Sequence, residues 1–293
     1  MVELTVLGIA QDGGRPQAGC LKSCCSTLTP SDVRYPVALG IVDHDGSTHL
    51  IEASRHLGEQ LRFIWKLPTG GDKKNKGIDH VWITHAHLGH VDGLGLLGRE
   101  AMNAEGIHLH VSESMANLIR RTPSWNLLAD LGVFDIEIFN REERFFQSST
   151  LQIEHVAIPH RAELSDMHGF IIRGLHKSLF FLPDQDSWED TLSAHDCRSI
   201  RHFLQKMRVD IALIDGTFWS FDELADMRDQ TQVPHPPVAQ TLNFLGSRLP
   251  QDPEILFIHL NHTNPLFDLS SAQYQTLQGM GWKVATQGMK FVL

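Results

Sequence analysis

The sequence has no long apolar run, few cysteines and fewer basic than acidic residues. Its 293 residues, 42% of them hydrophobic, suffice for a large buried core and argue against wholesale disorder. No apolar run approaches the roughly 18 residues that a membrane-spanning helix needs. A net charge of −10 disfavours broad binding to phosphate backbones. We therefore expect a small-molecule substrate and neither a nucleic-acid nor a membrane partner, and we leave a homodimer open.

The first residues do not have the pattern of a secretion signal. Val2–Ala10 reads V-E-L-T-V-L-G-I-A, without a basic start or a small-residue cleavage site. We interpret it as a first strand and expect a cytoplasmic location. Thr69–Gly77 is polar and glycine-rich and is interpreted as a surface loop.

Strand and helix patterns alternate along the chain. The predicted strands after the first are Val37–Asp43, Thr48–Ala53, Val81–Thr84, Ile107–Val111, Leu151–Ile158, Gly169–Ile172, Ser178–Leu182, Ile211–Ile214 and Ile255–Leu260. The predicted helices are His56–Lys66, Leu94–Ala104, Ser112–Arg121, Ile200–Met207, Val238–Leu245 and one that starts at Ser270 and ends at Gly279. This order indicates two packed sheets with helices outside, as one α/β domain over residues 1–293.

Histidine is frequent, with 18 residues, and several histidines follow predicted strands. The segment W-I-T-H-A-H-L-G-H places His85, His87 and His90 in the loop after a buried strand. His85 and His87 are two residues apart, so their side chains share one side of an extended backbone. The three imidazoles can converge in one pocket, although three solvated loop histidines are the alternative.

Further His and Asp residues follow four later strands. They are His160, Asp184, Asp186, Asp215, His259 and His262. Neutral imidazole and carboxylate are suitable ligands for Zn, Fe or Mn. Each residue alone would read as a loop or capping residue, but their repeated occurrence at strand ends predicts a metal site.

Three of the four cysteines, Cys20, Cys24 and Cys25, lie within six positions. Adjacent cysteines are poorly placed to form a disulfide with each other, and such a cluster in an intracellular protein indicates metal binding. Reduced, unligated thiols are the alternative. Cys197 is isolated and is interpreted as a core residue.

The order H-A-H-L-G-H, P-H, P-D and a late His resembles the metallo-β-lactamase superfamily, and within it the pyrroloquinoline-quinone biosynthesis protein B group. The resemblance rests also on D-G-G-R-P-Q-A-G-C-L-K-S-C-C, L-I-D-G-T-F-W, V-P-H-P-P-V and I-H-L-N-H-T-N-P. It implies a four-layer αββα sandwich with a metal site at one edge between the sheets. It also implies a structural zinc at Cys20, Cys24 and Cys25, with a fourth ligand that the sequence does not identify.

The resemblance also implies a ligand set. The first metal would be bound by His85, His87 and His160. Asp184 would bridge to a second metal, which His90 and a late histidine would complete. We prefer His262 for this position, because His259 still falls within the strand pattern.

The sequence departs from the superfamily motif H-x-H-x-D-H at Gly89. The missing carboxylate predicts a weaker second metal site. Asp92, Asp186 or Asp215 could compensate, and Asp215 is better suited to orient a ligand imidazole.

A metal in such a site lowers the pKa of bound water towards about 7 and so favours hydrolysis. We therefore predict a Zn-dependent hydrolase, with Fe or Mn as alternative metals, acting on a phosphodiester or other small ester. Asp184, Asp215 and His235 are the candidates for proton handling. A quinone-cofactor biosynthesis enzyme using iron and oxygen, and a non-catalytic protein with a degenerate site, are the alternatives. Transfer-RNA processing is disfavoured by the acidic charge.

Overall fold

A computed structural model describes residues 1–64, 77–139, 145–224 and 230–293. The expected loop Thr69–Gly77, except its last residue, and the last two residues of the expected helix His56–Lys66 lie outside these ranges. None of the described helices has the length and apolarity needed to cross a bilayer.

Two mixed sheets form the centre of the fold, each with seven strands in the described chain. The first has the order β14-β1-β2-β3-β4-β5-β6. Its strands are β1 (Glu3–Gly8), β2 (Ala38–Val42), β3 (Thr48–Ile51), β4 (His80–Trp82), β5 (Ile107–Val111), β6 (Phe134–Ile138) and β14 (Lys290–Val292). The second has the order β13-β12-β11-β10-β9-β8-β7. Its strands are β7 (Phe145–Gln147), β8 (Gln152–Ile158), β9 (Met167–Arg173), β10 (Ser178–Leu182), β11 (Ile211–Asp215), β12 (Glu254–Ile258) and β13 (Lys283–Val284).

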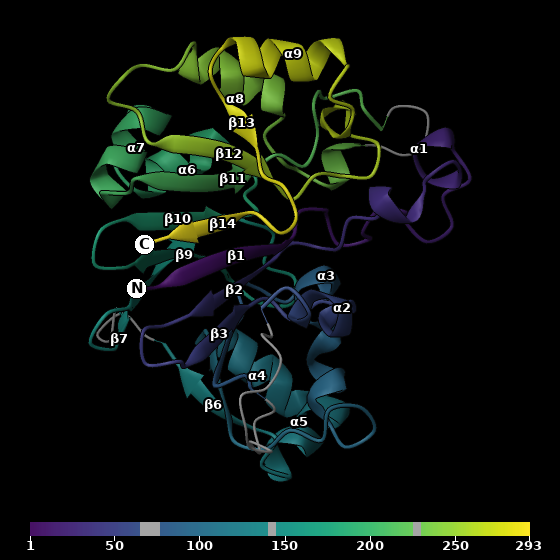
Figure 1. The fold of residues 1–293 in the computed structure, drawn as a ribbon, viewed down its shortest axis with the longest axis vertical. Helices are drawn as coiled ribbons and strands as arrows, with labels where there is room; N and C mark the ends of the chain where they lie inside the picture. Colours follow the sequence, from purple (N-terminus) through teal and green to yellow (C-terminus); the bar gives the residue numbers. More distant parts are fainter. Residues whose placement is uncertain (65–76, 140–144, 225–229) are drawn as a thin grey trace.

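Helices cover the outer face of each sheet, with α2, α4 and α5 on the first and α6–α9 on the second (Figure 1). The helices are α1 (Ser23–Ser26), α2 (Leu57–Leu61), α3 (Leu88–Val91), α4 (Glu113–Arg121), α5 (Pro123–Asp130), α6 (Trp188–Ala194), α7 (Ile200–Met207), α8 (Val238–Leu245) and α9 (Ala272–Gly279). Short 3₁₀ turns occur at η1 (Pro30–Asp32), η2 (Asp92–Leu97), η3 (Gln230–Gln232) and η4 (Pro265–Phe267). The expected αββα sandwich is confirmed.

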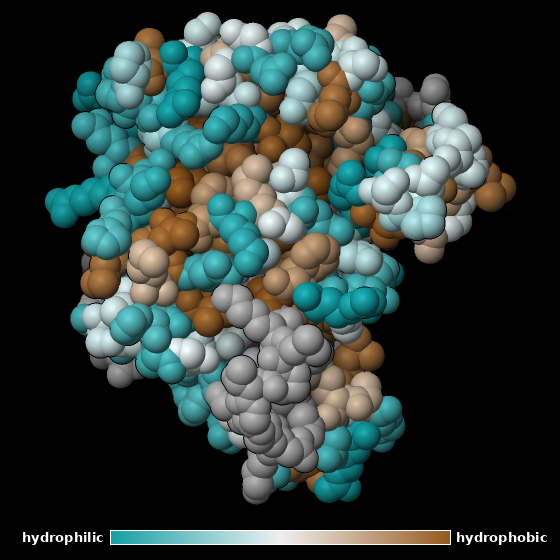
Figure 2. All heavy atoms as spheres, in the orientation of Figure 1, coloured by the Kyte–Doolittle hydropathy of each residue, from teal (hydrophilic) through white to brown (hydrophobic). Residues whose placement is uncertain are grey.

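The inner strands are apolar on both faces because each face meets a different core. In β10, Leu179 and Phe181 pack between the two sheets, whereas Phe180 and Leu182 pack against the helices. Strand β12 divides its side chains in the same way. In the space-filling view, hydrophobic side chains show mainly in the central region over the strands, and hydrophilic ones cover most of the outer helices (Figure 2). The continuous apolar runs in the sequence follow from this two-sided burial.

Several helix predictions differ from the structure. The expected helix Leu94–Ala104 is only the 3₁₀ turn η2 followed by turns, because Gly95 and Gly98 interrupt it. Helices α5 and α6 were not predicted. The last helix, α9, has Ser271 as its N-cap, whereas the prediction started the helix at Ser270. It ends at Gly279 as predicted.

Arg201 on α7 connects the end of α8 to the segment before β12. Its guanidinium donates to both Asp252 oxygens at 2.8 and 2.9 Å and to the carbonyl oxygens of Leu245 and Ser247. Asp252 is almost fully buried. Burial opposes its ionisation, but the Arg201 hydrogen bonds outweigh this and lower the pKa of Asp252.

We expect Arg201→Met to lower the free energy of unfolding by about 2 kcal/mol, because it leaves a buried carboxylate unpaired. Urea denaturation measures this, with Arg198→Met at an exposed position as the control. The Asp252 contribution is present above the unfolded pKa of 3.8 and disappears as the pH falls through the lower folded pKa. An effect of Arg201→Met no larger than that of Arg198→Met would contradict the prediction.

Candidate metal centre

The chemical groups of the site follow strands that point in one direction. Strands β3–β6 are mutually parallel, as are β10–β13, and two antiparallel steps give β1 and β8 the same direction as β3 and β10. The carboxyl ends of parallel strands meet at one edge of a sheet, where ligands commonly bind. The residues delivered there are Asp12, Glu52, His85, His160, Asp184, Asp215 and His259.

One group of ligand atoms comes from His85, His87 and His160, all within 4.8 Å of one another. His160 Nε2 lies 3.3 Å from His87 Nδ1. The Thr84 hydroxyl donates to Glu52 at 2.6 Å, so at 2.8 Å it accepts from His85 Nδ1. The lone pair of His85 is therefore on Nε2, which is buried without a hydrogen-bond partner among the described residues. Such an atom fits a metal ligand.

A second group consists of Asp12, His90 and His259, again within 4.8 Å. Asp12 Oδ1 lies 3.3 Å from His90 Nε2 and 3.4 Å from His259 Nε2. His90 Nδ1 lies 3.1 Å from Glu52. Thr217 donates to Asp215 at 2.7 Å and thus accepts from His259 Nδ1 at 2.9 Å. The Nε2 lone pair of His259 consequently faces carboxylate oxygens, an arrangement that needs a proton or a metal cation between them.

Asp184 lies between the two groups. Its Oδ1 is 3.8 Å from His160 Nε2, and its Oδ2 is 3.3 Å from His90 Nε2 and 3.5 Å from His259 Nε2. The carboxylate is buried. One oxygen therefore faces each group, which is the arrangement that a carboxylate bridging two metals requires.

The site concentrates negative charge, with Glu52 and Asp184 buried and Asp12 partly exposed. No Lys or Arg within the described ranges pairs with Asp12, Glu52 or Asp184. Burial opposes the ionisation of Asp184, but the neighbouring histidines, His259 first, hold its pKa well below the usual range. Burial likewise opposes protonation of His90, but Glu52 and the other carboxylates raise the pKa of His90 well above its usual value. The donor set fits cations of the Zn, Fe or Mn type.

His235 lies beside this centre and is held by Asp215. Its Nδ1 donates to Asp215 Oδ2 at 2.8 Å and lies 3.8 Å from Asp184 Oδ1. The ring is 5.7 Å from that of His160 and 5.8 Å from that of His259. Burial opposes the charged ring, but Asp215 outweighs it and raises the pKa of His235. Asp215 thus orients His235 directly and His259 through Thr217.

The structure places His259, and not the preferred His262, beside the His/Asp groups. Strand β12 ends at Ile258, and His259 has a left-handed backbone with φ of 64°, which turns its side chain out of the strand alternation. His259 therefore reaches the site, and His262 lies elsewhere. A regular strand pattern through Leu260 could not reveal this change of direction.

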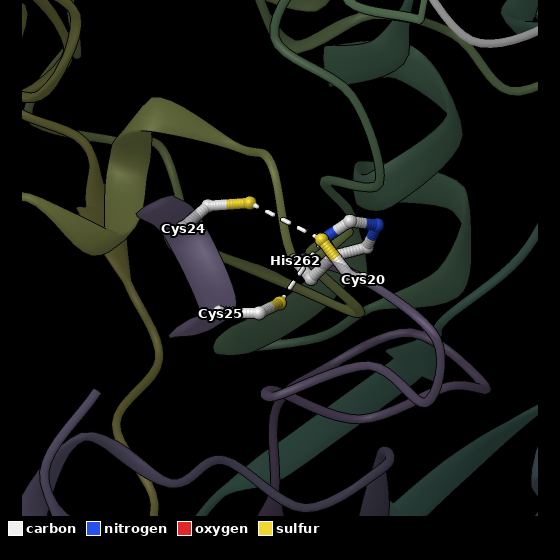
Figure 3. Close-up of side chains that lie close together, drawn as sticks. All are labelled: Cys20, Cys24, Cys25 and His262. Carbon is white, nitrogen blue, oxygen red and sulfur yellow. Dashed lines mark hydrogen bonds between the residues drawn. The ribbon is translucent and has the colours of Figure 1, made fainter. Parts of the chain in front are cut away.

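His262 instead completes the cysteine cluster. Its Nδ1 lies 3.5 Å from Cys24 Sγ and 3.4 Å from Cys25 Sγ, and Cys20 Sγ lies 3.8 Å from Cys24 Sγ (Figure 3). The ligand atoms of all four residues lie within 4.8 Å of one another. Burial and the neighbouring sulfurs raise the pKa of the Cys24 thiol to about 12, so the thiolate form of Cys24 needs a cation nearby. A Cys₃His set fits structural zinc.

The sequence patterns did not identify four residues of the site, namely Asp12, Glu52, Thr84 and Thr217. Asp12 and Glu52 both follow strands, so the pattern that identified Asp184 also applied to them. Of the proposed compensating acids, Asp92 is paired with Arg55 at 2.8 Å, and Asp186 lies 2.9 Å from His160 Nδ1. The hydroxyls carry no distinctive sequence pattern.

The αββα fold and the His/Asp groups at its strand ends define an α/β protein with a candidate metal centre. The chain belongs to the beta-lactamase superfamily, because the Beta-lactamase superfamily domain matches residues 48–260. It is 24% identical to Coenzyme PQQ synthesis protein B of Nitrosococcus oceani over 98% of this chain and 99% of that protein. The Cupriavidus taiwanensis protein of the same name is 26% identical over 100% of both.

Solved structures share the fold. Zn²⁺-bound PqqB from Methylobacterium extorquens has a TM-score of 0.77 at 19% identity, covering 99% of this chain and 100% of that one. A diphosphatase from the PhnP family has a TM-score of 0.66 at 20% identity, covering 99% and 96%. The resemblance to the metallo-β-lactamase superfamily and its PqqB-like group is confirmed.

The two late histidines should affect different metals. His259→Ala should remove metal from the His/Asp centre and leave the cysteine site loaded, and His262→Ala should do the reverse. Elemental analysis counts the metals, and thiolate-to-cobalt charge-transfer absorption in the Co(II) form reports the cysteine site alone. Loss of this absorption in His259→Ala, with retention in His262→Ala, would contradict the assignment.

Proposed function

We propose that this protein is a metal-dependent hydrolase acting on a phosphodiester or another small ester. The observation that carries the proposal is Asp184, whose two oxygens face separate groups of ligand nitrogens. Zn²⁺, with Mn or Fe as alternatives, would be held by His85, His87 and His160 on one side and by His90 and His259 on the other. Bound metal would supply activated water and stabilise the negative charge that develops during attack.

The residues around the ligands have distinct roles in this proposal. Thr84, Glu52 and Thr217 hold ring nitrogens and so orient the histidines. Asp215 holds Nδ1 of His235, which leaves Nε2 for proton transfer to the leaving group. Asp184, whose oxygens face both groups of nitrogens, would be the ligand shared by the two metals, and the neighbouring histidines hold its pKa well below the usual range.

Two side chains of the site are partly exposed to solvent. His87 and Asp12 have side chains that are 19% and 33% exposed, whereas His85, His90 and Asp184 are buried. Solvent therefore reaches the centre beside these two residues. The acidic net charge favours a small ester over a nucleic acid.

A second candidate function is a step in the biosynthesis of a quinone cofactor, with iron and oxygen. It is favoured by the full-length match to relatives named Coenzyme PQQ synthesis protein B. His and carboxylate ligands suit Fe as well as Zn.

The Zn or Mn form should hydrolyse bis(p-nitrophenyl) phosphate, and the release of p-nitrophenolate measures the rate.

His235→Asn should lower kcat by roughly 10²–10⁴-fold without removing metal, because the substitution removes the proton-transfer group and leaves the metal ligands in place. His85→Ala with His87→Ala should abolish both activity and metal at this centre and keep the cysteine-bound zinc. His176→Ala, at an exposed position, is the control. Unchanged kcat in His235→Asn would refute its role.

The alternative has its own assay. If the protein acts in quinone-cofactor biosynthesis, the Fe(II) form should consume oxygen in the presence of a tyrosine-containing peptide, and the Zn form should not. An oxygen electrode with mass spectrometry of the peptide measures this. Hydrolysis of the phosphodiester without oxygen uptake would exclude the alternative in favour of the hydrolase.

A further inference from the structure

Gly89, between His87 and His90, has no room for a side chain because Asp12 occupies the adjacent space. A Cβ at residue 89 would lie 2.3 Å from Asp12 Cα, 2.6 Å from its Cβ and 2.7 Å from its Cγ. All three distances are below any real contact. The backbone and side chain of Asp12 therefore take the position that a side chain on residue 89 would occupy.

The Asp12 carboxylate points to the same nitrogens as Asp184. Asp12 Oδ1 lies 3.3 Å from His90 Nε2 and 3.4 Å from His259 Nε2. Asp184 Oδ2 lies 3.3 and 3.5 Å from the same two atoms. Two imidazole nitrogens and two carboxylate oxygens thus converge on one point, a donor set that suits a divalent transition metal.

The backbone fixes this position of Asp12. Gln11 N donates to Leu260 O at 2.9 Å, and Leu260 N donates to Ile9 O at 2.8 Å. The loop after β1 therefore forms hydrogen bonds with both the backbone N–H and the carbonyl oxygen of Leu260, the residue after His259. His259 itself adopts its left-handed conformation at this point. Asp12 and His259 consequently belong to one backbone-linked unit.

Other acidic residues are engaged differently. Asp92 pairs with Arg55, Asp186 contacts His160 Nδ1, and Asp215 accepts from His235. None of these groups forms a metal-competent cluster with His90 and His259 among the described residues, whereas Asp12 does.

We propose that Asp12 is a ligand of the second metal, so that Asp12, His90, His259 and Asp184 form a complete four-ligand site. The inference rests on the proposed dinuclear centre and deepens it. It revises the expectation of a weak second site, because the carboxylate missing at Gly89 is supplied by the loop after β1.

Metal titration of Asp12→Asn tests this ligand. The protein is stripped of metal at the His/Asp centre while it keeps the cysteine-bound zinc, and is titrated with Mn²⁺ by calorimetry and electron paramagnetic resonance. The wild type should bind two equivalents and show a spin-coupled Mn pair. Asp12→Asn should bind one equivalent with unchanged affinity, bind the second about 10- to 100-fold more weakly or worse, and lose the coupled signal.

Asp92→Asn is the matched control, because Asp92 follows His90 closely yet pairs with Arg55. It should still bind two equivalents of metal.

Gly89→Ala should also weaken binding of the second metal, because its new methyl group displaces the Asp12 backbone. Retained cysteine-bound zinc shows that each variant is folded. Unchanged second-metal affinity in Asp12→Asn would overturn the inference. If the wild type binds two metals but hydrolyses no ester, the proposed function is contradicted, whereas the role of Asp12 as a ligand is still supported.

Discussion

The carboxylates at one edge of the two sheets, with Glu52 and Asp184 buried and Asp12 partly exposed, are the constraint on which the site depends. Asp12, Glu52 and Asp184 face imidazoles and, within the described chain, no Lys or Arg. Isolated charges of this kind are costly to bury unless they are paired or coordinate a metal. The hydroxyl oxygens of Thr84 and Thr217 accept hydrogen bonds from Nδ1 of His85 and of His259, respectively. These bonds place the proton of each ring on Nδ1, so that the lone pair on Nε2 points into the site. The side chains of the centre are therefore oriented to bind cations.

The fold explains why these groups meet. Both sheets deliver parallel strand ends to the same edge, and apolar packing on both faces of β10 and β12 holds these ends rigidly. The cysteine cluster serves a different purpose, because Cys20, Cys24, Cys25 and His262 connect the N-terminal loop to the segment after β12. The same two segments carry Asp12 and His259. A metal at the cysteine cluster would thus also stabilise the loop that positions Asp12.

Much of this site could be predicted from local pattern. His85, His87, His90, His160 and Asp184 follow buried apolar strands, and a strand end is a place where side chains of adjacent strands converge. Their identification as candidate ligands needed only the strand boundaries and the chemistry of the residues, whereas their division between two metals came from the family resemblance. His235 was identified as a candidate from its rigid proline-flanked loop, and the structure places it beside Asp184 and Asp215.

The sequence by itself determined an α/β fold with two packed sheets, and it identified the His, Asp and Cys residues that could bind metal, because periodicity and residue chemistry are local properties. Only the tertiary structure decided how those residues divide. A single left-handed residue at His259 exchanges the roles of two histidines three positions apart. The close approach of Asp12 to Gly89 joins residues 77 positions apart, and no local pattern records that contact. Backbone direction at one residue and packing between distant loops are set by the whole fold.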